Sequence, residues 1–278
     1  MPELPEVETV VRTLRPVLLN RRLARVELTR ADVVCPADCD LPRRLTGRRV
    51  TDITRRGKRI VITLDDANRF YVHLGMTGRL TVEPARAPVE KHTHLLVRLS
   101  DAGRELRFRD PRRFGGIWWL GADACDEQMG PEPLTLRATE LARRLTRTTR
   151  AIKNVLLDQR VIAGVGNIYA DEALFAARIH PLRPANQLDD DEIRRLNRAL
   201  KMTLRRAVRH RGSSLRDYVD ADGARGAFQS LHRVYDRAGE PCRACKHLVE
   251  RIVLGGRSTH FCPNCQAPRP APAPSRRC

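Results

Sequence analysis

The amino terminus places groups capable of covalent chemistry at the start of the chain. Residues 1–6 read Met-Pro-Glu-Leu-Pro-Glu. Removal of Met1 would leave the secondary amine of Pro2 as the first group, and a terminal amine with a pKa of about 8 can attack a masked aldehyde to form an iminium. Glu3 and Glu6 lie close enough in sequence to move protons for such a step. The alternative interpretation is a plain helix start, since proline is common in the first turn of a helix.

A second set of chemically active residues is a pair of cysteine knuckles. Cys242-x2-Cys245 and Cys262-x2-Cys265 are separated by 16 residues, which is the spacing of a four-cysteine zinc site. Disulfides are the alternative, but a basic intracellular protein favours metal binding. Four thiolates leave no open position for water, so we predict one structural Zn²⁺. The other cysteines have no partner at a ligand spacing and are expected to be buried or surface thiols: Cys35, Cys39, Cys125 and Cys278.

The segment between the knuckles predicts a hairpin. Residues 248–254 alternate weakly and meet Gly255-Gly256, a strong hairpin turn signal. Arg257 follows directly and is expected to project from the hairpin tip.

A glycine turn precedes an apolar helix in the middle of the chain. Gly164-Val165-Gly166 leads into Asn167, which is the expected N-cap. Helix amino ends bind anions, so this turn is a candidate phosphate cradle. An ordinary capped turn is the alternative, because the pattern is neither a complete dinucleotide fingerprint nor a P-loop.

Composition indicates the partner. The 278 residues carry 52 Lys+Arg against 33 Asp+Glu, a formal net charge of +19. A polyanion with closely spaced phosphates binds such dispersed cations favourably, because the contacts release its counterions. Nucleic acid is therefore the expected partner, and the aromatic content of 4% argues against a single-strand binder built on base stacking. No apolar run approaches the 18 residues of a membrane helix, so we expect a soluble intracellular protein with no membrane partner.

The elements that must position these residues are predicted from periodicity. Residues after Pro5 place their apolar side chains on one helix face, and residues 23–120 alternate as strands joined by turns at 65–68 and 100–103. We predict an α+β protein that begins with a helix and an antiparallel β-sandwich or barrel. Beyond a linker near 130–133, the period predicts helices at about 136–158, 168–178 and 189–211, the last ending at Gly212. Residues 267–277 are rich in proline and are expected to be disordered.

Six ordered stretches resemble the formamidopyrimidine-DNA glycosylase family, which excises oxidised purines, over residues 1 to about 266. The matching stretches are residues 2–8, 55–58, 73–76, 110–115, 164–169 and 235–265. The resemblance implies a catalytic β-sandwich domain at 1–130, a helix-two-turn-helix domain at 131–230, a zinc finger at 231–266 and a dispensable tail at 267–278.

The same resemblance implies the chemistry. Pro2 would attack C1′ of the damaged nucleotide and displace the base, Glu3 would donate and shuttle protons, and Glu6 would support the amine. Lys58 would assist β-elimination and Arg257 would assist δ-elimination, and both could act mainly by gripping phosphates.

The resemblance also implies how DNA is held. A flipped nucleotide leaves a void in the duplex, and Met76, Arg112 and Phe114 are similar to the residues that fill it, although local packing is the alternative for each. The expected DNA contacts are Lys58, His92, Arg112, Lys153, Asn167 and Arg257. A basic cluster typical of the family is replaced by Arg147-Thr148-Thr149-Arg150, which puts a contact near Thr148 in doubt. The loop at 212–229 resembles the one that covers the flipped purine.

Three functions remain open. The leading one is a bifunctional glycosylase and AP lyase that acts on formamidopyrimidine and 8-oxoguanine in duplex DNA. The second is an oxidised-pyrimidine glycosylase of the sister group, which Leu4 and the Arg112–Phe114 pair disfavour. The third is a catalytically silent, zinc-dependent DNA-binding protein. We expect a monomer that works in the bacterial cytoplasm at the nucleoid.

Overall fold

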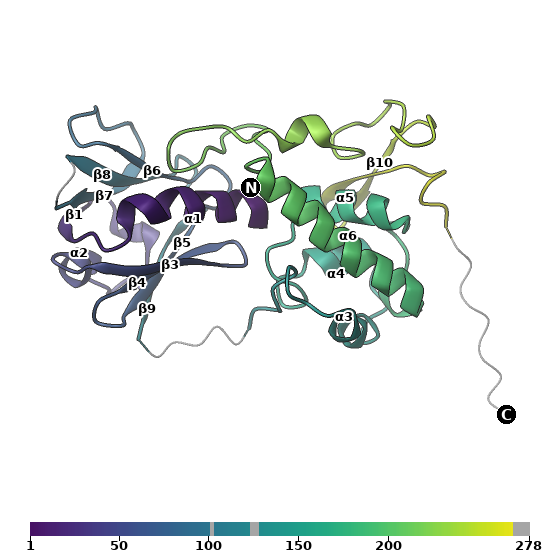
Figure 1. Cartoon of the computed structure of the whole chain (residues 1–278), viewed down its shortest axis with the longest axis horizontal. Coiled ribbons are helices and arrows are strands. Elements are labelled where there is room, and N and C mark those ends of the chain that lie inside the picture. Colours follow the sequence, from purple (N-terminus) through teal and green to yellow (C-terminus); the bar gives the residue numbers. More distant parts are fainter. Residues whose placement is uncertain (101–102, 123–127, 269–278) are drawn as a thin grey trace. The chain divides into compact units, whose positions relative to one another are not determined.

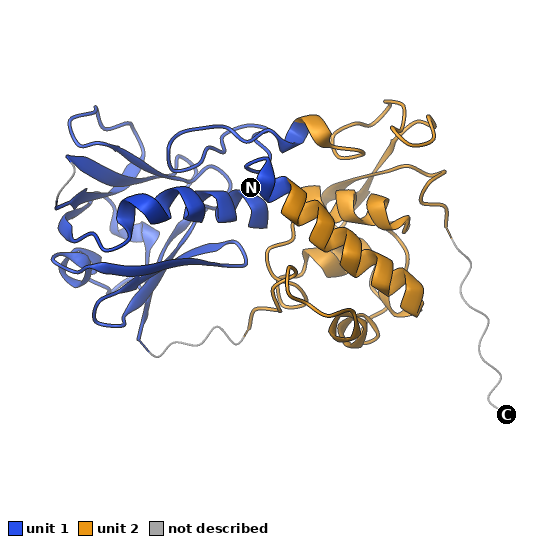
Figure 2. Cartoon of the chain, viewed as in Figure 1, with its two compact units in different colours: residues 1–127, 207–229 blue, residues 128–206, 230–278 orange. Residues whose placement is uncertain are grey.

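The computed structural model describes residues 1–100, 103–122 and 128–268, which form parts of two compact units (Figure 2). Unit 1 comprises residues 1–127 and 207–229, and unit 2 comprises residues 128–206 and 230–278. The turn predicted at 100–103 lies partly outside the described residues. Most of the predicted tail, Cys125 and Cys278 also lie outside them.

Unit 1 contains two β-sheets around one core (Figure 1). The four-stranded sheet has the order β1-β7-β8-β6 and the five-stranded sheet has the order β2-β9-β5-β4-β3. All pairings are antiparallel except β2 with β9, so the predicted antiparallel sandwich is confirmed. The strands are β1 (Leu23–Leu28), β2 (Val34–Cys35), β3 (Val50–Arg56), β4 (Arg59–Leu64), β5 (Arg69–His73), β6 (Arg79–Pro84), β7 (Thr93–Leu99), β8 (Arg104–Arg109) and β9 (Gly116–Gly121).

The amino-terminal helix α1 (Leu4–Leu18) contacts strands of both sheets, namely β3 and β4 of one and β6 of the other. Its apolar face is buried, as the periodicity predicts, with Val7, Val10 and Leu14 fully shielded from solvent. The helix therefore holds the terminus that precedes it in a fixed place. Shorter helices of unit 1 are η1 (Ala31–Val33) and α2 (Leu41–Leu45).

Unit 2 is mainly helical and ends in a two-stranded hairpin. Its elements are α3 (Ala138–Leu145), α4 (Ile152–Leu157), α5 (Asn167–Ala177), η2 (Ala185–Gln187), most of α6 (Asp190–Arg209), η3 (Phe228–Leu231, shared with unit 1), β10 (Glu250–Leu254) and β11 (Arg257–Phe261). The helix predicted at 136–158 is two helices. The break falls at Thr148, whose hydroxyl accepts a hydrogen bond from the Arg150 N–H and so competes with helical bonding.

The long helix α6 is confirmed with both of its predicted ends. Asp189 and Glu192 exchange hydrogen bonds at its start, each carboxylate accepting the other's backbone N–H at 2.7 and 3.0 Å. At the far end Gly212 has a φ of +76° and donates its N–H to the Ala207 carbonyl, which closes the last turn. No helix among the described residues is long and apolar enough to cross a membrane.

Candidate active site and nucleic-acid contacts

The amino terminus is buried together with both of its carboxylates. Pro2 is buried, and Glu3 and Glu6 are 3% and 1% exposed. Glu3 is the N-cap of α1 and forms a capping box with Glu6, in which the Glu3 N–H donates to Glu6 Oε2 at 2.8 Å. The backbone that carries Pro2 is thereby fixed at the start of the helix.

Glu6 also ties the terminus to the loop that follows α6. Its second oxygen, Oε1, accepts the Ser213 N–H at 2.7 Å, and its backbone carbonyl accepts the Tyr218 hydroxyl at 3.2 Å. A Cβ on Gly212 would lie 2.5 Å from Glu6 Oε1, so glycine is required there both for this approach and for its positive φ. Glu6 is thus a bridge between α1 and residues 212–218, which sequence reasoning missed because the partners are 207 residues apart.

Lys58 lies in the turn between β3 and β4, where Gly57 has a φ of +56°. The lysine is 7% exposed, and its carbonyl lies 3.3 Å from His73 Nδ1 at the end of β5. Burial lowers the pKa of His73 below its ordinary value, which favours the neutral imidazole. Pro2, Glu3, Glu6 and Lys58 all belong to unit 1, whereas Arg257 belongs to unit 2.

The three predicted void-filling residues sit on two loops that touch. A Cβ on Gly75 would be only 2.4 Å from the backbone of Phe114, so the loop carrying Met76 lies directly against the loop carrying Arg112 and Phe114. The Arg112 guanidinium stacks over the Phe114 ring at 4.5 Å. Met76 and Phe114 are 39% and 55% exposed, so both are available to a partner.

A buried carboxylate, Asp110, joins these two loops. It is fully buried and accepts hydrogen bonds from the Thr77 hydroxyl and from the Arg112 and Gly115 N–H groups. The Asp110 N–H in turn donates to the carbonyl of His92, whose side chain is exposed. Sequence reasoning gave Asp110 no role, although the Asp-Pro pair at 110–111 is a turn signal that could have drawn attention to it.

In unit 2 the predicted contacts differ sharply in exposure. Arg257 is exposed and begins β11 directly after the Gly255–Gly256 turn, both of whose glycines have positive φ, which confirms the predicted hairpin. Lys153 is 0% exposed and Asn167 is partly buried. Asn167 is not the N-cap of α5, which is Gly166; its side-chain amide instead donates to the Ser258 carbonyl at 2.9 Å.

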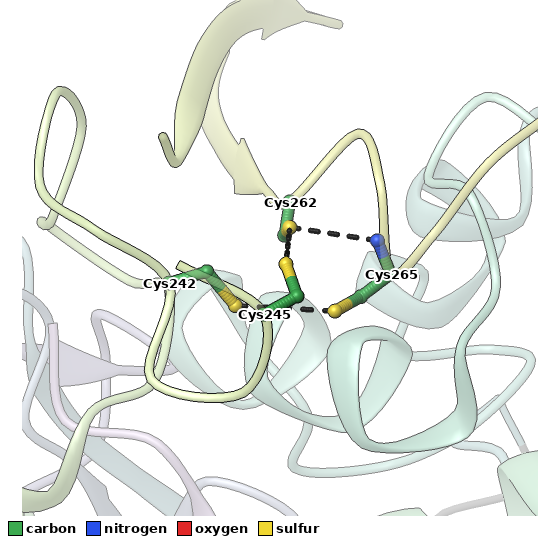
Figure 3. A group of neighbouring side chains, drawn as sticks. All are labelled: Cys242, Cys245, Cys262 and Cys265. Carbon is green, nitrogen blue, oxygen red and sulfur yellow. Dashed lines mark hydrogen bonds between the residues drawn. The ribbon is translucent and has the colours of Figure 1, made fainter. Parts of the chain in front are cut away.

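The zinc cysteines converge in unit 2 (Figure 3). The four sulfur atoms of Cys242, Cys245, Cys262 and Cys265 lie within 4.8 Å of one another, with 3.4 Å between Cys245 and Cys262 and 3.9 Å between Cys242 and Cys265. Four sulfurs bound tetrahedrally at about 2.3 Å from Zn²⁺ would be roughly 3.8 Å apart, so the cluster fits one structural zinc ion. Cys35 and Cys39 belong to no such group among the described residues.

Three protein families match successive parts of the chain. The formamidopyrimidine-DNA glycosylase N-terminal domain matches residues 1–117, the H2TH domain of the same enzymes matches residues 129–219, and a zinc finger found in FPG and IleRS matches residues 239–268.

Whole proteins match over almost the full length. A protein of Herpetosiphon aurantiacus named formamidopyrimidine-DNA glycosylase is 47% identical over 275 residues, which cover 96% of this chain and 100% of the relative. A Lactococcus lactis FPG mutant solved with Fapy-dG containing DNA has a TM-score of 0.90 at 36% identity, covering 96% of this chain and 100% of that one. A MutM structure solved with carbocyclic 8-oxo-G containing DNA has a TM-score of 0.89 at the same identity and coverage.

Proposed function

The chain belongs to the formamidopyrimidine-DNA glycosylase family, and we propose that it removes oxidised purines from duplex DNA and then cleaves the strand at the abasic site. The observation that carries the proposal is the imino terminus, which is buried with two carboxylates and fixed by the capping box of α1. A protein that only bound DNA would have no use for such a terminus. The substrate class follows the relatives solved with Fapy-dG and 8-oxo-G DNA.

The first step is displacement of the base. The lone pair of the Pro2 nitrogen forms a bond to C1′, the glycosidic bond breaks, and the base leaves with that electron pair and takes up a proton. Opening of the sugar ring, with protonation of its oxygen, leaves Pro2 as an iminium. Glu3 is the proton carrier, a role supported by its position next to Pro2 and its burial.

Strand cleavage follows from the iminium. The cation withdraws electrons from C2′, loss of a C2′ proton expels the 3′ phosphate, and a second elimination expels the 5′ phosphate. Lys58 and Arg257 assist these steps by holding the phosphates that depart. Hydrolysis of the imine then frees the terminus for another cycle.

The residues on the touching loops would replace the extruded nucleotide. Met76 and Phe114 offer apolar surface, and Arg112, held over the Phe114 ring, offers planar donors to the orphaned base. Such an enzyme works as a monomer on the DNA of the bacterial nucleoid, in the cytoplasm.

The test is borohydride trapping on a duplex that contains 8-oxoguanine opposite cytosine, with an oxidised-pyrimidine duplex alongside. We expect a reduced adduct that maps to Pro2 and forms preferentially on the purine lesion. A matched variant with one alanine inserted between Met1 and Pro2 turns the imino nitrogen into an amide, and it should lose the adduct while it still binds damaged DNA.

Each other outcome contradicts part of the proposal. Undiminished trapping or nicking by the insertion variant would rule out Pro2 as the nucleophile. Preference for the pyrimidine duplex would assign the protein to the sister group. Tight binding without any adduct would leave a catalytically silent DNA-binding protein.

A further inference from the structure

Unit 2 contains a buried ion pair whose role is not explained by DNA binding. Lys153 of α4 and Asp171 of α5 are 0% and 1% exposed, and Lys153 Nζ lies 2.6 Å from Asp171 Oδ1. Removing two charges from water is costly, and only good geometry and further hydrogen bonds offset that cost. The partners of the pair therefore indicate what it stabilises.

Those partners are consecutive residues of strand β11, immediately after Arg257. Lys153 Nζ donates to the Ser258 carbonyl and to the Thr259 hydroxyl, both at 2.8 Å. Asp171 Oδ2 accepts the His260 N–H at 2.9 Å. The amide of Asn167 donates to the same Ser258 carbonyl, so the segment 258–260 is held by side chains from both helices.

The hairpin needs this support because it is a small element. A two-stranded hairpin alone is marginally stable in water, and β10–β11 pairs over only five residue pairs. The zinc cysteines anchor its base, where Cys262 follows β11 directly. At the tip, a Cβ on Gly255 would lie 3.1 Å from the side chain of Asn154. Between these points the Lys153–Asp171 pair anchors the middle of the strand.

We propose that Lys153 and Asp171 are positioning residues, which hold strand β11 so that Arg257 meets the DNA backbone in a defined place. The buried Lys153 Nζ donates two hydrogen bonds, to the Ser258 carbonyl and the Thr259 hydroxyl, and its charge is paired with Asp171 Oδ1 at 2.6 Å. Its contribution to DNA binding is therefore exerted through Arg257 and not through a phosphate contact of its own. This inference rests on the proposed function, in which Arg257 grips a phosphate.

The experiment is a double-mutant cycle on the salt dependence of binding to a duplex with a non-cleavable abasic-site analogue. Loss of one phosphate contact should reduce the slope of log K against log salt by about 1, and this is the result expected for R257A. K153M should give a similar reduction, and K153M/R257A should give no more than R257A alone. Zinc content and circular dichroism establish that each variant is folded.

The Asp171→Asn variant distinguishes a positioning role of Lys153 from a direct contact between Lys153 and a phosphate. The variant keeps the lysine charge and the shape of the carboxylate, so a direct phosphate contact by Lys153 would survive. If the pair positions Arg257, the D171N variant should lose DNA affinity and show the same reduced slope of log K against log salt as R257A, while it retains its zinc.

Opposite results overturn the proposal in identifiable ways. A reduction of about 2 in the double variant would show that Lys153 contacts a phosphate itself. Binding by D171N equal to the parent protein would show that the pair does not position Arg257. An unchanged slope for R257A would remove the premise about Arg257, whereas Pro2 trapping would still test the catalytic function separately.

Discussion

At the scale of single residues, a buried polar group fixes the loops that carry the proposed DNA contacts. Met76, Arg112 and Phe114 are at the surface, but the loops that carry them meet at Asp110, which is fully buried. Altering a buried acceptor that satisfies three donors should lower the free energy of unfolding, because a donor left unpaired loses its hydration without a replacement hydrogen bond.

Replacement of Asp110 by asparagine should therefore destabilise unit 1. One acceptor oxygen becomes an NH₂ group that faces a donor, and the fixed Gly115 N–H cannot reorient, so we expect a loss of about 1–3 kcal/mol in the free energy of unfolding. Urea denaturation measures this loss, with Thr77→Val as the matched control that removes only the hydroxyl bond. A midpoint for D110N equal to that of the parent would contradict the role given to this carboxylate.

At the scale of elements, the hairpin that carries the zinc cysteines packs on a small buried cluster. Its buried cluster contains only Phe175, Val234, Val249 and two of the cysteines. Structural zinc in small modules contributes an apparent binding free energy of about 10–16 kcal/mol, far more than this cluster can supply. We therefore expect that the hairpin carrying Arg257 folds only when zinc is bound.

Chelation of zinc should unfold residues 242–265 and weaken binding to damaged duplex by about tenfold or more, which corresponds to about 1.4 kcal/mol. Hydrogen exchange of the β10–β11 amides and DNA titration follow the two effects, and added Zn²⁺ should reverse both. Cys35→Ser is the control, since Cys35 lies outside the cluster. Unchanged affinity after verified loss of metal would show that the hairpin is not a DNA contact.

At the scale of the whole molecule, the net charge of +19 predicts a large electrostatic contribution to binding. Arginine supplies most of the cations, and its planar guanidinium suits phosphate recognition. This contribution is independent of sequence and of the lesion, because phosphates repeat along every duplex.

Binding to undamaged duplex should accordingly fall steeply with salt. With about six phosphate contacts the slope of log K against log salt is about −5, and affinity drops roughly 10³-fold between 50 and 200 mM salt. Fluorescence anisotropy over this range measures the slope. A magnitude below about 2 would mean that most of the positive charge lies away from the DNA.

Features that depend on neighbours along the chain could be predicted from the residues alone. Alternation along β4, the one-sided apolar pattern of α1 and the ends of α6 are local patterns, and the structure confirms each of them. The alternation predicted for β7 is not found, because all of its residues except Arg98 are buried. The zinc site is predictable for the same reason, because two residues between cysteines suffice to bring both thiolates to one metal. The resemblance of six ordered stretches identified the family, which the comparisons confirm.

Features that depend on contacts between distant segments could be recognised only in the folded protein. No local pattern shows that Lys153 is buried against strand β11, that Glu6 meets Ser213 across 207 residues, or that Asp110 joins two loops. A lysine or glutamate reads as a surface charge in sequence, because burial of a charge is set by partners that folding brings together. The chemistry proposed for the site could therefore be predicted from residue types. The positions of its side chains are set by the packing of sheets and helices, which residue types alone do not show.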